Sequence, residues 1–215
     1  MRGFILRLWH SKRAASAAEF ALVLPLMLIL LLGMIDVGRF MWELNRAEKA
    51  TQVGARFAVV TDPVSPGLVN ADFASGTLAA GELIPSEALD ELKCDSSACT
   101  CSGSGACPVT DTTVDTAAFD AIVERMNLID PRITDENVEV VYRGSGFGFA
   151  GDAGGAPGGG GAGGATETME ISPLVTVRLR DVSFTPVTGF LLFSMDLPPL
   201  SATLPAEDAA GTYSN

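Results

Sequence analysis

Phe20–Ile35 reads FALVLPLMLILLLGMI, sixteen residues without a charged side chain. As a helix this run is about 24 Å long, and a helix begun at Ala14 reaches about 33 Å, enough to cross the ~30 Å hydrocarbon core of a membrane. A buried core helix is the alternative, but a basic segment precedes the run and Asp36 follows it, which fits a membrane span better. We predict a transmembrane segment at 15–36. By the positive-inside rule, the basic leader 1–14 lies in the cytoplasm and the body outside.

The candidate processing sites lie before the apolar run. After the run, Gly33–Arg39 offers no small-x-small pattern of the kind that precedes a signal peptidase site. The five residues Ala14–Ala18, all small, stand before the run instead. Cleavage among them would leave the apolar segment on the mature protein as an anchor.

Glu19 is the one charged residue inside the longer apolar span. An acid near the membrane core is destabilising unless it is paired. One interpretation is an interfacial acid that reaches the cytoplasmic edge of the membrane. The other gives it a cationic partner. If the chain were cut after Ala14, Glu19 would be the fifth residue of the mature chain, and the new N-terminal amine of the same or a neighbouring subunit could neutralise it.

Short motifs in this region carry a family resemblance. Basic residues, small residues, Glu19-Phe20 and then an apolar run resemble the class III, prepilin-type signal. The sequences EFALVLP at 19–25, GMIDVGR at 33–39 and GAR at 54–56 resemble the TadE-like pseudopilins of the tight-adherence (Flp, type IVc) pilus systems. The resemblance implies that a membrane prepilin peptidase cuts between Ala14 and Ala15, and that Glu19 and Phe20 serve assembly.

The same resemblance implies a structural function. It is that of a minor pilin or pseudopilin-like component for assembly or priming of a Tad pilus, without catalysis of its own. The implied partners are the prepilin peptidase, other pilins or pseudopilins, inner-membrane pilus assembly proteins and the membrane. The implied location is the inner membrane, single-pass, with the N-terminus cytoplasmic and the body periplasmic, either in the fibre or at its base. The alternative is a signal-anchored envelope protein with an adhesive or ligand-binding periplasmic head.

Charge and histidine content exclude several other functions. Residues 19–215 hold ten basic and 26 acidic side chains, a net charge of -16, so the body repels nucleic acid. The single histidine, His10, lies in the basic leader, which excludes histidine-dependent triads and metal sites in the body. We expect no catalytic residue, no cofactor and no metal.

The helix is predicted to continue past the membrane, as a periplasmic extension at 37–60. Residues 36–60 contain no proline, and Pro63 and Pro66 follow. Apolar or small residues recur at spacings of three or four, the pattern of a helix that packs on a globular body. They stand at positions 40, 44, 47, 50, 53, 57 and 60.

The remaining residues, 61–215, are predicted to form a small head. The fold class is therefore α+β: a long N-terminal transmembrane-plus-periplasmic helix and a small head on an antiparallel sheet, the plan of a pilin. A glycine-rich loop at 144–164 separates two of the strands, and GFLLF at 189–193 is either core or a contact for a partner. The expected helices are 81–92 and 113–128, and the expected strands are 137–142, 170–182 and 200–204.

The four cysteines fall within one loop, 94–107. Zinc sites favour pairs spaced C-x2–4-C, whereas Cys94, Cys99, Cys101 and Cys107 supply one C-x-C. With the body on an oxidising side of the membrane, two disulfides are the better interpretation. Sequence leaves the three possible pairings open, with Cys99–Cys101 sterically the least comfortable.

This interpretation predicts that the folded, non-reduced protein contains no free thiol. Two cross-links would each stabilise so short a loop by about 2–3 kcal/mol if unstrained. Thiol labelling should detect nothing in the wild type, and Cys107→Ser should leave an odd thiol that forms mixed dimers. Four reactive thiols, or stoichiometric zinc that protects them, would eliminate the disulfides and restore the metal site.

Overall fold

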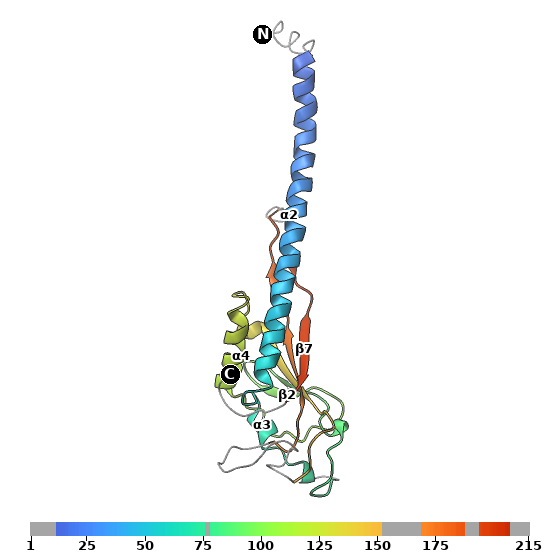
Figure 1. The fold of residues 1–215 in the computed structure, drawn as a ribbon, viewed down its shortest axis with the longest axis vertical. Coiled ribbons are helices and arrows are strands. Elements are labelled where there is room, and N and C mark those ends of the chain that lie inside the picture. The colour runs from blue at the N-terminus through green and yellow to red at the C-terminus, as the bar shows by residue number, and fades with distance from the viewer. Residues whose placement is uncertain (1–11, 76–77, 152–168, 188–193, 207–215) are drawn as a thin grey trace. The chain divides into compact units, whose positions relative to one another are not determined.

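A computed structural model describes residues 12–75, 78–151, 169–187 and 194–206 (Figure 1). The chain divides into two compact units. The first unit comprises Met1–Leu44 and Ser183–Asp196, and the second comprises Asn45–Val182 and Leu197–Asn215. The second unit holds the larger sheet, and the first holds the apolar part of the long helix.

The predicted long helix is confirmed as α2, Lys12–Ala58, which runs for 47 residues and retains Pro25 inside it. From Ser16 to Leu32 its side chains are exposed. In the second unit, residues of the predicted apolar helix face pack into the core: Ala47, Ala50 and Phe57 are buried. One continuous helix thus contributes an exposed apolar segment to one unit and a packed segment to the other.

The second unit is built on a five-stranded antiparallel sheet with strand order β2-β1-β3-β4-β7. The expected α+β class with an antiparallel sheet is therefore confirmed. Each predicted strand is present with shifted ends, and the predicted second helix is α4. The strands are β1 Leu92–Cys94, β2 Cys99–Cys101, β3 Val138–Arg143, β4 Leu174–Leu179 and β7 Leu200–Pro205, and α4 is Thr116–Asn127. A separate pair, β5 Ser183–Phe184 with β6 Met195–Asp196, belongs to the first unit. The short helices are α3 Pro66–Val69, η1 Phe73–Ser75, η2 Ser86–Ala88 and η3 Asp135–Asn137.

The core of the second unit lies where α2, α4 and the sheet meet. Val175, Val177 and Leu179 of β4 are buried at alternate positions, as the period-two pattern of a half-buried strand requires. The side chain of Asp115 caps α4 by accepting a hydrogen bond from the Ala118 N–H at 3.0 Å. This cap fixes the start of α4, so that its buried residues Phe119, Ile122 and Met126 face the core.

The contact between α2 and α4 needs a glycine at one position. A Cβ built on Gly54 would come within 2.6 Å of the Met126 sulfur and 3.6 Å of Val177. Gly33 and Gly38 differ, because nothing lies within 4 Å of a Cβ built on either. The glycine of the GAR motif is thus explained by packing, whereas contacts among the described residues do not require the glycines of GMIDVGR.

Two expectations about the head need correction or fall outside the described residues. The predicted helix at 81–92 is wrong, because Pro85 and a positive φ of 84° at Gly81 break it. Only η2 forms there, and Leu92 enters β1. The glycine-rich loop is described only as far as Gly151, and its remainder, like 189–193, lies outside the described residues.

Gly54→Leu should destabilise the second unit by about 1–3 kcal/mol, because the larger side chain overpacks the α2–α4 contact. Gly38→Leu is the matched control, and with open space around it the change should leave stability unchanged or raise it by up to about 1 kcal/mol. Thermal unfolding of the two full-length variants in detergent measures the difference. Equal melting temperatures for both would contradict the packing account.

Candidate functional site

The apolar segment of α2 is the first candidate feature. An 18-residue window of this helix has a mean hydropathy of 2.6, and only 6% of the window is buried within the protein. Large side chains such as Leu22 and Leu26 are 80% and 72% exposed. A core helix of a soluble domain would bury such residues. One helix near the N-terminus is therefore long and apolar enough to span a membrane.

The predicted processing and assembly residues lie at the start of this helix. Ala14 and Ala15 belong to α2, whose described part begins at Lys12. Glu19 is exposed, and Phe20 is 64% exposed. The structure thus keeps both assembly candidates on the helix surface, within two turns of the proposed cut.

The second candidate feature is the Asp36 carboxylate, the polar centre of GMIDVGR. Asp36 is 7% exposed, although it directly follows the apolar run. Its Oδ1 accepts a hydrogen bond of 2.6 Å from the backbone N–H of Val187. Arg39 lies one turn further along the helix, with its guanidinium nitrogen 3.7 Å from the same oxygen. A charged acceptor therefore ties the β5–β6 hairpin to α2.

Aromatic contacts also attach the β5–β6 hairpin to α2. The Phe184 ring of β5 meets Phe40 edge to face, with centroids 5.4 Å apart and planes at 79°. The Arg39 guanidinium stands 5.6 Å from the same ring centroid, within the range of a cation–π interaction. Arg39 also pairs with Glu43 at 3.4 Å. One face of α2, formed by residues three, four and seven positions from Asp36, thus holds the hairpin.

A similar arginine–aspartate contact joins α2 to the end of α4 in the second unit. Asp130 is fully buried at the end of α4 and pairs with Arg132 at 2.7 Å. Arg46 of α2 donates to the Ile129 carbonyl at 2.8 Å and lies 3.8 Å from Asp130. Burial raises the pKa of Asp130, but the bonds from Arg132 and the charge of Arg46 outweigh it, so the pKa is lowered. The carboxylate stays ionised and binds α2 to the end of α4.

A charge network covers part of the sheet surface. Glu91 accepts from Ser102 at 2.8 Å and pairs with Lys93 at 3.2 Å, with Arg178 at 3.5 Å and, more closely, with Arg143. Burial raises the pKa of Glu91, but these hydrogen bonds outweigh it and lower the pKa to about 2. The network links β1, β3 and β4, and each of its charges has a partner.

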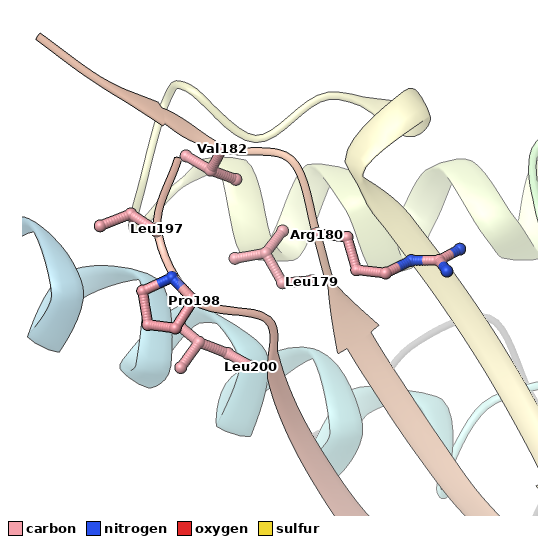
Figure 2. A pocket seen from close by; sticks show the side chains of 6 residues that line it. All are labelled: Leu179, Arg180, Val182, Leu197, Pro198 and Leu200. Carbon is pink, nitrogen blue, oxygen red and sulfur yellow. The ribbon is translucent and has the colours of Figure 1, made fainter. Parts of the chain in front are cut away.

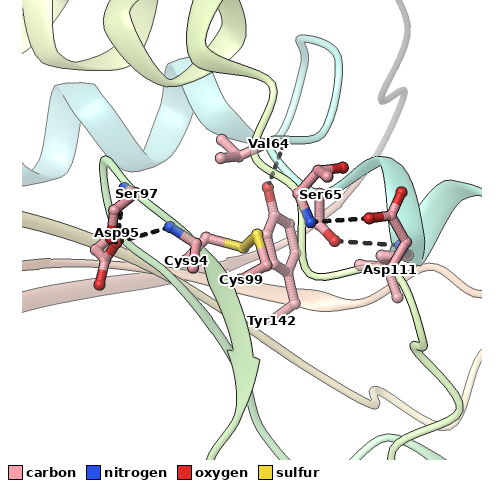
Figure 3. Close-up of a disulfide and its surroundings, with 11 residues drawn as sticks. Val64, Ser65, Cys94, Asp95, Ser97, Cys99, Asp111 and Tyr142 are labelled. Atoms are coloured by element: carbon pink, nitrogen blue, oxygen red, sulfur yellow. Dashed lines mark hydrogen bonds between the residues drawn. A yellow bond between two sulfur atoms is a disulfide. The ribbon is translucent and has the colours of Figure 1, made fainter.

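Three of the cysteines, Cys94, Cys99 and Cys101, lie on the edge hairpin of this sheet, and Figure 3 shows the Cys94–Cys99 disulfide. Cys94 pairs with Cys99 across β1 and β2, and Cys101 pairs with Cys107. The Asp95 carboxylate accepts from the Ser97 and Ala98 amides and so forms the turn. The predicted loop 94–107 therefore begins as a disulfide-bridged hairpin.

The buried Tyr142 packs beside this hairpin, in the view of Figure 3, and connects the sheet to the chain after α2. Its hydroxyl accepts a hydrogen bond of 2.9 Å from the Val64 N–H. Burial raises the pKa of Tyr142 above its usual range. The phenol therefore stays neutral and serves as a fixed structural contact.

No metal site emerges from the described ranges, which do contain a small pocket. No group of three or more His, Cys, Asp or Glu residues among them could hold a metal. Figure 2 shows a small pocket lined mostly by apolar side chains. The pocket is lined by Leu179, Arg180, Val182, Leu197, Pro198 and Leu200.

Sequence reasoning missed two of these contacts. Asp36 was noted only as the acid that ends the apolar run, and its partner Val187 lies 151 positions away. Arg46 and Ile129 are 83 positions apart. The spacing of Asp36, Arg39 and Glu43 on one helix face was an available signal, but nothing in it identified the hairpin as the occupant.

Comparison with known proteins agrees with the N-terminal motifs. The family model described as "TadE-like protein" matches residues 14–56. The suspected resemblance is confirmed for this segment, which indicates a Tad pilus-associated protein. The match covers the helix from the proposed cut to the GAR motif. No curated protein and no solved structure matches the chain.

Asp36→Ala should loosen the β5–β6 hairpin, because it removes the acceptor of the Val187 N–H. A hydrogen bond to a charged group contributes about 1.5–3 kcal/mol, so the Val187 amide should exchange about one to two orders of magnitude faster. Hydrogen–deuterium exchange of the full chain in detergent measures this rate. Glu48→Ala, an exposed change on the same helix, is the control. An unchanged rate in Asp36→Ala would show that the hairpin is held by its aromatic contacts alone.

Proposed function

We propose that this TadE-like chain is a minor pilin or pseudopilin-like structural component that assembles or primes a Tad (type IVc) pilus. The observation that carries the proposal is α2 itself. One helix joins an exposed apolar segment, long enough to span a membrane, to a segment that packs against a small α+β head. This is the plan of a pilin, and the family match at 14–56 lies on the same helix.

In this proposal the chain is held in the inner membrane by residues 15–36. The basic leader stays in the cytoplasm, residues 37–60 extend the helix into the periplasm, and the head follows. The two disulfides support a periplasmic head, because such bonds persist in oxidising compartments. The charge pairs and the buried tyrosine have structural partners, which supports a structural rather than an enzymatic function.

Maturation begins when a prepilin peptidase cuts between Ala14 and Ala15. The cut removes the leader with its four basic residues and creates a new amine at the start of the helix. Glu19 is then the fifth residue, about one helical turn from that amine. A carboxylate at this depth is stabilised by a cation, either its own N-terminus or that of the subunit it joins. Glu19, with Phe20 beside it, would therefore favour assembly only after processing.

The alternative is a signal-anchored envelope protein with an adhesive or ligand-binding head. Such a protein would keep its leader and would need no partner for Glu19. Processing and Glu19 therefore decide between the two functions.

N-terminal sequencing of the protein from cells that carry the peptidase should begin at Ala15. Ala14→Leu should abolish the cut because the bulky side chain does not fit a site for small residues, whereas Ala17→Leu should still be cut. Retention of Met1 in the wild-type protein would refute processing and favour the anchored alternative.

Glu19→Gln should insert into the membrane normally, since one acid contributes little against so apolar a span, but should not associate with other pilus components. Membrane extraction measures insertion, and co-purification together with piliation measures assembly. Glu48→Gln, an exposed change further along α2, is the matched control and should assemble. Normal piliation by Glu19→Gln would remove the proposed charge pairing.

A further inference from the structure

The first unit shows an arrangement of polar and apolar surface that membrane anchoring alone does not require. Asp36, Arg39 and Glu43 lie on one face of α2, and this face holds the β5–β6 hairpin through Asp36 and Phe184. Successive residues of a helix are about 100° apart, so Val37 and Met41 lie on other faces. The charges of this helix segment are therefore gathered on the hairpin side.

The remaining surface of the same helix turns is apolar and exposed. Val37, Met41 and Trp42 are 60%, 52% and 60% exposed. This surface continues the exposed apolar segment without a break, because the intervening charges, Asp36 and Arg39, lie on the hairpin side. The apolar surface thus extends six residues, about 9 Å, beyond Asp36.

The hairpin adds apolar surface at the same level of the helix. Val187, whose N–H binds Asp36, is 49% exposed, and Met195 of β6 is 43% exposed. Among the described residues of the hairpin, Asp196 is the only charged one. An exposed apolar surface that continues a membrane-spanning surface is in contact with lipid unless another protein covers it.

We propose that the described residues of the β5–β6 hairpin, 183–187 and 194–196, and the α2 turns from Val37 to Trp42 form a collar that lies in the outer-leaflet interface of the membrane. The occupant of this apolar surface is lipid at the headgroup level. The inference rests on the proposed membrane span of α2 and extends it. The collar places a second segment of the chain, distant in sequence, against the membrane surface.

The dimensions and chemistry of the interface fit this collar. Headgroup layers add about 5–8 Å to each side of the hydrocarbon core, and tryptophan is enriched there. Helical side chains point back toward the N-terminus, so the Trp42 ring covers the turn before it, within that layer. The hairpin covers the Asp36 carboxylate, which lipid would otherwise meet, while the Arg39 side chain stays 42% exposed at the level of the headgroups.

Depth-dependent fluorescence quenching tests the collar. The full chain with Trp9→Phe has Trp42 as its only tryptophan. In phosphatidylcholine–phosphatidylglycerol vesicles, Trp42 should lose more fluorescence to lipids brominated close to the headgroup than to lipids brominated near the chain end. Iodide in the aqueous phase should quench it weakly.

The hairpin needs its own reporters, with Trp9 and Trp42 both changed to Phe. Val187→Trp should behave as Trp42 does, since the Val187 N–H that binds Asp36 is kept. Met195→Trp is a second reporter in case the first does not fold. Phe147→Trp, at an exposed position of the other unit, is the control and should be quenched by iodide and not by brominated lipid.

A reporter within the span separates failure of the collar from failure of the proposed anchor. In the same background, Leu28→Trp should be quenched by lipids brominated near the chain end. If brominated lipid quenches Leu28→Trp but iodide quenches the hairpin reporters, the collar is wrong and the proposed membrane span of α2 is supported. If the hairpin reporters are protected from both quenchers, protein rather than lipid covers them, which also overturns the collar. If Leu28→Trp is not quenched by lipid, the membrane span itself fails, and the collar with it.

Discussion

The structure depends on one constraint, which is that the single helix α2 continues through two different surroundings. It has to meet two requirements in both: its backbone groups must stay hydrogen-bonded, and its side chains must suit each surrounding. Backbone groups inside a bilayer find no water, so only a continuous helix meets the first requirement. The second requirement is met by changing the side chains. Large exposed apolar residues as far as Trp42 give way to small buried ones such as Ala47 and Ala50. Gly54 then lets α4 approach closely enough to form a core.

Arginine–aspartate contacts compensate the buried acids that lie on or against α2. Asp36 binds Arg39 and the Val187 amide in the first unit, and Asp130 binds Arg132 and faces Arg46 in the second. Each acid is nearly or fully buried, and each is compensated by a guanidinium and by hydrogen bonds, as a buried charge requires. These contacts make α2 the element to which distant segments of the chain attach.

Local signals were sufficient for several elements of the head. The alternation in β4 and the apolar spacing of α4 each indicate burial on one side, and the apolar run of β3 is buried at five successive residues. These elements were therefore predicted with ends shifted by a few residues. The helix expected at 81–92 failed because Pro85 and the left-handed Gly81 outweigh the apolar spacing around them. Leu92 is buried in a strand because β1 pairs with β3. The local sequence around Leu92 does not reveal this pairing.

The sequence by itself determined the long helix, its exposed apolar segment, the candidate processing residues and the family resemblance, because each depends on residues close together in the chain. It limited the cysteines to two disulfides but left their pairing open. Only the tertiary structure paired Cys94 with Cys99, brought Val187 to Asp36 and set Arg46 against Asp130. The physical reason is that these contacts depend on strand register and on helix packing. Both are decided by the whole core rather than by any local pattern.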